Sequence, residues 1–96
     1  MKVKVRVFGD LIDFLGSAEL TINLDDAAKV ADLISKIDEV KAGFKEKMEI
    51  LSRRRGAADF GLTMLVNGKN INVLNGLETR LKDNDTVVFL PPVAGG

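Results

Sequence analysis

The residues of this chain that could carry chemistry are those of its final hexapeptide, PPVAGG, which spans Pro91 to Gly96. A C-terminal carboxylate is an anion at neutral pH and a poor electrophile, so it reacts only after conversion into an activated acyl group. Gly95 and Gly96 lack a Cβ atom, which lets the backbone enter a narrow channel and leaves the terminal carbonyl open to attack. Pro91 and Pro92 cannot extend a sheet. These features predict a projecting tail that another protein recognises.

The rest of the chain offers little for catalysis. Its 96 residues include no cysteine and no histidine. It therefore has no thiolate nucleophile, cannot hold its own persulfide, and lacks the commonest general base at neutral pH. We expect no catalytic residue, no metal site and no bound cofactor, and we therefore do not expect an enzyme.

The charge is balanced, with 14 basic and 14 acidic residues, so no global field favours nucleic acid or an anionic membrane. Arg53, Arg54 and Arg55 could bind phosphate, but three consecutive helical positions point in different directions. With no Trp or Tyr to stack bases, we expect no nucleic-acid partner. No apolar run approaches the roughly 18 residues of a membrane span, and MKVKVRVFGD begins a strand pattern instead of a signal peptide. We expect a cytoplasmic protein with no membrane partner.

The first elements are predicted from periodicity. Residues Lys2 to Val7 alternate strictly, with three valines on one face, which is typical of a half-buried strand. Asp10 to Gly16 favours a single helical turn closed by Gly16. Glu19 to Leu24 alternates again, and two such strands so close in sequence favour an antiparallel pair.

A helix follows, capped by Asp25 or Asp26. Its apolar positions have the spacing of one helix face, namely Val30, Leu33, Ile34, Ile37 and Val40. The segment Lys41 to Gly61 is less regular. Within it, FKEKMEILSRRR resembles a second, weaker helix, and GAADFG is interpreted as a loop.

Strand character returns in the last third of the chain. The run Leu62 to Val66 leads into Asn67-Gly68, a strong signal for a type I′ hairpin turn, with a short partner strand around Asn70 to Val73. A turn or helical loop follows, in which Asn84 suits a left-handed position. The run Thr86 to Leu90 is apolar on both faces and is therefore predicted to lie inside the sheet, beside the first strand.

This order of elements predicts an α+β fold of the β-grasp, or ubiquitin-like, type. A mixed sheet of about four to five strands would be covered on one face by one main helix, which lies in the crossover between the parallel first and last strands. We assign residues 1–90 to this domain and residues 91–96 to a flexible C-terminal tail ending in Gly-Gly.

The stretch Leu65 to Gly96 resembles the MoaD/ThiS family of sulfur carriers, which includes the small subunit of molybdopterin synthase, and the related archaeal small modifier proteins. The resemblance rests on Asn67, Thr79, Leu81, Asp83, Asp85 and, above all, PPVAGG. Met1 to Val40 fits the same plan more loosely. Where the family often has Asp-Gly-Asp before the last strand, this chain has Asp83-Asn84-Asp85, which suits the same backbone.

The resemblance implies that an ATP-dependent activating enzyme adenylates the carboxylate of Gly96, where covalent attachment would occur. Recognition of the tail would then involve Gly95, Ala94, Val93, Pro92 and Pro91. In one reading, sulfur converts the activated group into a thiocarboxylate, and the tail delivers it inside the large subunit of molybdopterin synthase. The product would be the dithiolene of the molybdenum or tungsten cofactor.

Two alternatives remain. A lysine of another protein could attack activated Gly96 and form an isopeptide bond, which would make the chain a ubiquitin-like modifier, and one protein could serve both uses. The chain could also be an interaction domain whose tail is never activated. Deletion of Gly95 and Gly96 would abolish the function of a sulfur carrier or of a modifier. It would leave the function of an interaction domain intact.

Partners are expected to bind the sheet surface near the tail. In the last strand, Val87 and Phe89 point to one side, and Val88 and Leu90 to the other. We expect one pair to lie in the core and the other to help form an apolar contact site. The alternation does not say which pair is which.

Overall fold

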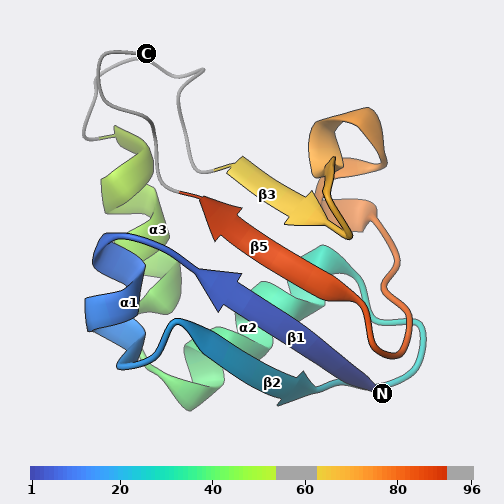
Figure 1. Ribbon diagram of the computed structural model, residues 1–96, viewed down its shortest axis with the longest axis horizontal. Coiled ribbons are helices and arrows are strands. Elements are labelled where there is room, and N and C mark those ends of the chain that lie inside the picture. The colour runs from blue at the N-terminus through green and yellow to red at the C-terminus, as the bar shows by residue number, and fades with distance from the viewer. Residues whose placement is uncertain (54–62, 91–96) are drawn as a thin grey trace.

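In a computed structural model, the chain forms a five-stranded sheet with helices on one side (Figure 1). The structure describes residues 1–53 and 63–90, with side chains for 1–50 and 63–90. The elements are β1 (Lys2–Val7), α1 (Asp10–Leu15), β2 (Glu19–Asn23), α2 (Val30–Val40), α3 (Phe44–Arg53), β3 (Thr63–Val66), β4 (Lys69–Asn70), the 3₁₀ turns η2 (Ile71–Val73) and η3 (Gly76–Glu78), and β5 (Thr86–Leu90).

The order of strands in the sheet is β2-β1-β5-β3-β4. β5 is parallel to β1 and antiparallel to β3, while β2 pairs antiparallel with β1. The predicted mixed sheet and the predicted interior position of Thr86–Leu90 are both confirmed. In Figure 1, α2 passes behind β1 and β5, as expected for the helix of a crossover between parallel strands.

The core lies between the sheet and the helices. The three valines of β1 are at most 1% exposed, and β5 contributes Val87 and Phe89, both at 0%. α2 buries Val30, Leu33, Ile34 and Ile37 against them. Val40, which the helical spacing placed on the same face, is 65% exposed. It is the last residue of α2.

The start of α2 differs from the prediction, because neither Asp25 nor Asp26 caps it. The helix begins at Val30, and the carboxylate of Asp32 accepts a hydrogen bond from the Lys29 N–H at 2.8 Å. The residues before it are held by the chain segment that precedes β5. The Val30 N–H donates to the Thr79 carbonyl, and the Leu81 N–H donates to the Ala28 carbonyl. Because of these bonds, α2 begins several residues later in the sequence than a cap at Asp25 or Asp26 would predict.

The second helix predicted within residues 41–61 is confirmed as α3. Its first residue, Phe44, is fully buried, so this segment contributes to the core as well as to the surface. The predicted GAADFG loop lies outside the described residues, as do Leu62, Arg54 and Arg55.

Turn chemistry agrees with the sequence at several points. Gly16 closes α1 with a φ of 80°, and Asn67, Gly68 and Asn84 have φ values of 50°, 86° and 70°. The strand predicted around Asn70 to Val73 is shorter than expected. β4 ends at Asn70, whose side-chain oxygen accepts a hydrogen bond from the Asn72 N–H at 2.9 Å and so favours a 3₁₀ turn over a strand.

Candidate functional site

The sheet has one face that the described helices leave open, which we call the outer face. The predicted alternation in β5 is confirmed, and the structure fixes its sense. Val87 and Phe89 point into the core, whereas Val88 and Leu90 are partly exposed on the outer face. Pairing with β1 sets this choice, because Val87 lies opposite Val5 and Phe89 opposite Val7. Of the two pairs in β5, Val88 and Leu90 are therefore the one that can contribute to a contact surface.

The two neighbouring strands add to this surface on either side. Leu65 of β3 lies opposite Val88 and is also partly exposed, so three apolar side chains occupy adjoining positions. On the other side, Arg6 of β1 lies opposite Val88, and Lys4 lies opposite Thr86. The outer face thus carries an apolar strip (Leu65, Val88, Leu90) next to the basic side chains of Lys4 and Arg6.

Sequence reasoning missed Leu65, Arg6 and Lys4 as parts of this surface. The strict alternation of β1 already placed Lys4 and Arg6 together, opposite the valines. The order of strands brings them beside Val88, and that order depends on pairing between residues about 80 positions apart. Arg6 also pairs with Glu19 at 3.4 Å, and both side chains are more than half exposed, so solvent screens this ion pair.

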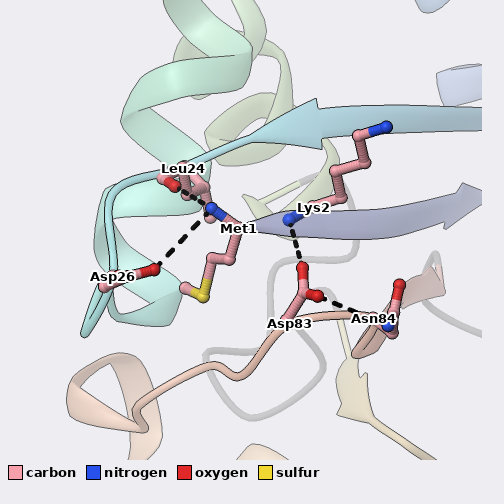
Figure 2. A network of polar contacts seen from close by, with 6 residues as sticks. All are labelled: Met1, Lys2, Leu24, Asp26, Asp83 and Asn84. Atoms are coloured by element: carbon pink, nitrogen blue, oxygen red, sulfur yellow. Dashed lines mark hydrogen bonds and ion pairs between the residues drawn. The ribbon is translucent and has the colours of Figure 1, made fainter.

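The beginning of β5 is anchored to the beginning of β1 (Figure 2). The Lys2 N–H donates to the Asp83 carboxylate at 2.7 Å, and the Asn84 N–H donates to the Lys2 carbonyl at 2.7 Å. Figure 2 also shows the amino group of Met1 donating to the Leu24 carbonyl at 2.7 Å, with Asp26 at 3.8 Å. These bonds connect β1 with β2 on one side and with the approach to β5 on the other.

A second set of bonds joins the β3–β4 turn to β5. The Asn67 side chain donates from its amide nitrogen to Asp85 at 2.8 Å and accepts from the Thr86 N–H at 2.9 Å. The other carboxylate oxygen of Asp85 accepts from the Lys82 N–H at 2.8 Å. The Asn67, Asp83 and Asp85 positions of the sequence pattern therefore fix the strand that leads to the tail.

The tail itself, residues 91–96, lies outside the described residues, so the roles of Pro91, Pro92, Val93, Ala94, Gly95 and Gly96 stay predictions. β5 ends at Leu90, immediately before them. Among the described residues, no cluster of acidic side chains has the arrangement of a metal site, and every buried side-chain polar atom has a hydrogen-bond partner. None of the described helices is both long and apolar enough to cross a membrane.

The structure also has an apolar surface that the sequence did not suggest. Around η2 and η3, Val73, Leu74 and Leu77 are 76%, 36% and 47% exposed. Leu77 borders a cleft of about 430 Å³ between α2 and α3, whose walls include Ile34 and Met48. These residues follow no strand or helix period, so periodicity alone could not identify them.

Comparison with known proteins gives a consistent picture. The pattern of the ThiS family matches residues 5–96. The chain is 28% identical to small archaeal modifier protein 3 of Haloferax volcanii and 30% identical to a putative sulfur carrier protein of Archaeoglobus fulgidus, each over the full length of both chains. Its structure is similar to that of a putative molybdopterin converting factor, subunit 1, from Pyrococcus furiosus. That match has a TM-score of 0.74 and 31% identity, and it covers 97% of this chain and 99% of the other.

Proposed function

Because the chain belongs to the ThiS family of small β-grasp carrier and modifier proteins, we propose that it carries sulfur as a thiocarboxylate on Gly96. We further propose that it does so as the small subunit of a molybdopterin synthase. In this role the chain performs no catalysis and is a substrate of an ATP-dependent activating enzyme. It binds no cofactor of its own.

The proposed chemistry uses the terminal carboxylate. An oxygen of the Gly96 carboxylate attacks the α-phosphorus of ATP, pyrophosphate leaves, and an acyl-adenylate forms. Sulfide, or a protein persulfide together with a thiol reductant, then displaces AMP and leaves the thiocarboxylate. The sulfur must come from another molecule, because this chain has no cysteine. When an acceptor takes the sulfur, water restores the carboxylate.

The observation that carries this proposal is the placement of β5. The strand that precedes PPVAGG is held between β1 and β3, and it presents Val88 and Leu90 beside Leu65 on the open face of the sheet. A partner that binds this apolar strip would bind the strand that directly precedes the tail in the sequence. Lys4 and Arg6 on the adjoining strand would orient a partner that carries acidic residues at the matching border.

The role in molybdopterin synthesis is supported by the likeness to the Pyrococcus furiosus protein, which is named as subunit 1 of a molybdopterin converting factor. The direct test is a reconstitution. The chain bearing the thiocarboxylate is mixed with a molybdopterin synthase large subunit and its precursor, and dithiolene formation is measured. One dithiolene is expected for every two thiocarboxylate-bearing chains, because a dithiolene holds two sulfur atoms and each chain carries one. Sulfur that stays on the chain would contradict the molybdopterin role while leaving the sulfur-carrier role intact.

The second candidate function is modification of proteins, and the likeness to a small archaeal modifier protein favours it. Here the amine of a target lysine attacks the activated carbonyl of Gly96 and forms an isopeptide bond. The test is mass spectrometry of cell extracts for lysines that carry the C-terminal residues of this chain. Adducts that vanish on deletion of Gly95 and Gly96 are expected for a modifier. If neither adducts nor thiocarboxylate form, the chain is a plain interaction domain.

A further inference from the structure

The chain contains two Asn-Gly dipeptides, Asn67-Gly68 and Asn75-Gly76. In such a dipeptide, the glycine nitrogen can attack the side-chain carbonyl carbon of asparagine, because glycine has no Cβ to hinder the approach. Ammonia leaves, a succinimide ring forms, and water opens the ring to aspartate or isoaspartate. We propose that Asn75 is a site of spontaneous deamidation in the folded protein, whereas the hydrogen bonds of Asn67 protect it from the same reaction.

The two dipeptides are otherwise well matched. Both asparagines are exposed to solvent. Both glycines have positive φ values, 86° for Gly68 and 59° for Gly76, and at both positions an added Cβ would meet no atom within 4 Å. Access of water and the space around the glycine are therefore similar at the two sites. The sites differ in how many hydrogen bonds hold each asparagine in place.

Asn67 is held at three points. Its side-chain amide nitrogen donates to Asp85 at 2.8 Å, its side-chain oxygen accepts from the Thr86 N–H at 2.9 Å, and its backbone N–H donates to the Thr86 carbonyl at 2.8 Å. All three bonds lead to β5 or to the residue before it. The side-chain carbon that must receive the Gly68 nitrogen is thus fixed toward β5, and attack requires these bonds to break.

The Asn75 side chain has no such restraint from the described residues. Among the hydrogen bonds between described residues, none involves its amide group. Its backbone is held only locally, because its N–H donates to the Thr79 hydroxyl at 3.0 Å and its carbonyl accepts from the Glu78 N–H at 3.1 Å. Ring closure requires rotation of the Asn75–Gly76 peptide group. This rotation opens η3, which consists of one 3₁₀ turn. One exposed turn opens far more readily than a sheet.

The reaction would change the surface around η2 and η3. Aspartate at position 75 lowers the net charge of the chain from zero to minus one. The new carboxylate would lie beside the exposed side chains of Leu74 and Leu77. Isoaspartate would also insert a methylene into the backbone between the bonds to Thr79 and Glu78, so it would disturb η3. The modification therefore alters an apolar surface that lies away from the outer face of the sheet.

The test compares the two sites within one sample. The untagged chain is incubated at mildly alkaline pH, digested with trypsin and analysed by mass spectrometry. Cleavage after Arg55, Lys69 and Arg80 puts Asn67 in peptide 56–69 and Asn75 in peptide 70–80. In the folded protein we expect peptide 70–80 to gain the mass of an amide-to-acid change, with Asn67 reacting about tenfold or more slowly because its hydrogen bonds must open first.

A parallel incubation in denaturant removes the hydrogen bonds of the folded protein. Under that condition the deamidation rates of Asn67 and Asn75 should become equal. Equal rates in the folded protein, or no reaction at Asn75, would overturn the proposal. A difference that persists in denaturant would also overturn it, because sequence and not structure would then be the cause.

Two variants sharpen the result. Asn75→Gln should stop the mass change in peptide 70–80 and leave peptide 56–69 unaffected, since ring closure with the longer side chain is unfavourable. Asp85→Ala removes one partner of Asn67 and should accelerate reaction at Asn67 alone, with circular dichroism as the check on folding. An unchanged rate at Asn67 in folded Asp85→Ala would contradict the protective role of that bond.

Discussion

The ring of Phe44, at the start of α3, meets the ring of Phe89, near the end of β5, edge to face, with centroids 5.6 Å apart and planes at 83°. Both side chains are fully buried. The contact links the least regular part of the sequence to the strand that leads to the tail. Helix α3 is thus part of the support of β5.

Phe44→Ala is expected to lower the free energy of unfolding by about 3–5 kcal/mol, because it leaves a cavity against Phe89. Ile50→Ala is the matched control on the same helix, since Ile50 is 46% exposed, and it should cost less than about 1 kcal/mol. Urea denaturation measures both. Equal losses would show that α3 does not pack on β5 as described.

Val88→Glu should weaken binding to the activating enzyme by about tenfold or more, because it places a charge in the apolar strip of the outer face. Thr21→Glu is the control. Thr21 is exposed on the same face, and it lies opposite Lys4 much as Val88 lies opposite Arg6. Binding is measured by calorimetry, with thermal melts to verify folding. If Thr21→Glu weakened binding as much, a general charge effect would replace the apolar strip as the explanation.

Asn67→Gly should cost about 1–2 kcal/mol of stability through loss of two side-chain hydrogen bonds. Glycine tolerates the φ of 50° at this position, so strain does not contribute. Asn84→Gly provides the comparison, because Asn84 also has a positive φ but its side chain makes only a 3.4 Å contact with Asp83. Chemical denaturation should find Asn84→Gly the milder change. The reverse order would argue against the role of Asn67 in fixing β5.

Asp32→Ala should cost about 1 kcal/mol, because its carboxylate satisfies the Lys29 N–H at the start of α2. Asp25→Ala should be nearly neutral, since Asp25 does not cap the helix. Thermal unfolding distinguishes the two variants. A larger loss for Asp25→Ala would favour a helix that begins earlier than Val30.

The sequence predicted those features that depend on local pattern. Strict alternation identified β1, and Asn67-Gly68 marked the turn between β3 and β4, because both positions of a type I′ turn need a positive φ. The composition of Thr86–Leu90 identified an interior strand. Each of these properties can be recognised within a few residues, before any long-range contact is known.

Other features depended on contacts between distant residues. Alternation gives the period of β5 but not which side is buried, and pairing with Val5 and Val7 decides that Val87 and Phe89 point inward. The start of α2 was misplaced because bonds from Thr79 and Leu81 hold the preceding residues. The burial of Phe44 could not be predicted without the sheet on which it packs.

Activation of Gly96 can be tested by the intact mass of the untagged chain after incubation with ATP, its activating enzyme and a sulfur donor. A chain lacking Gly95 and Gly96 serves as the control. We predict that the full chain gains the mass difference between one sulfur and one oxygen, with the change located at Gly96, and that the shortened chain does not change. A full chain that keeps its original mass, and that forms no tail-dependent adduct with lysine, would contradict the claim that Gly96 is activated.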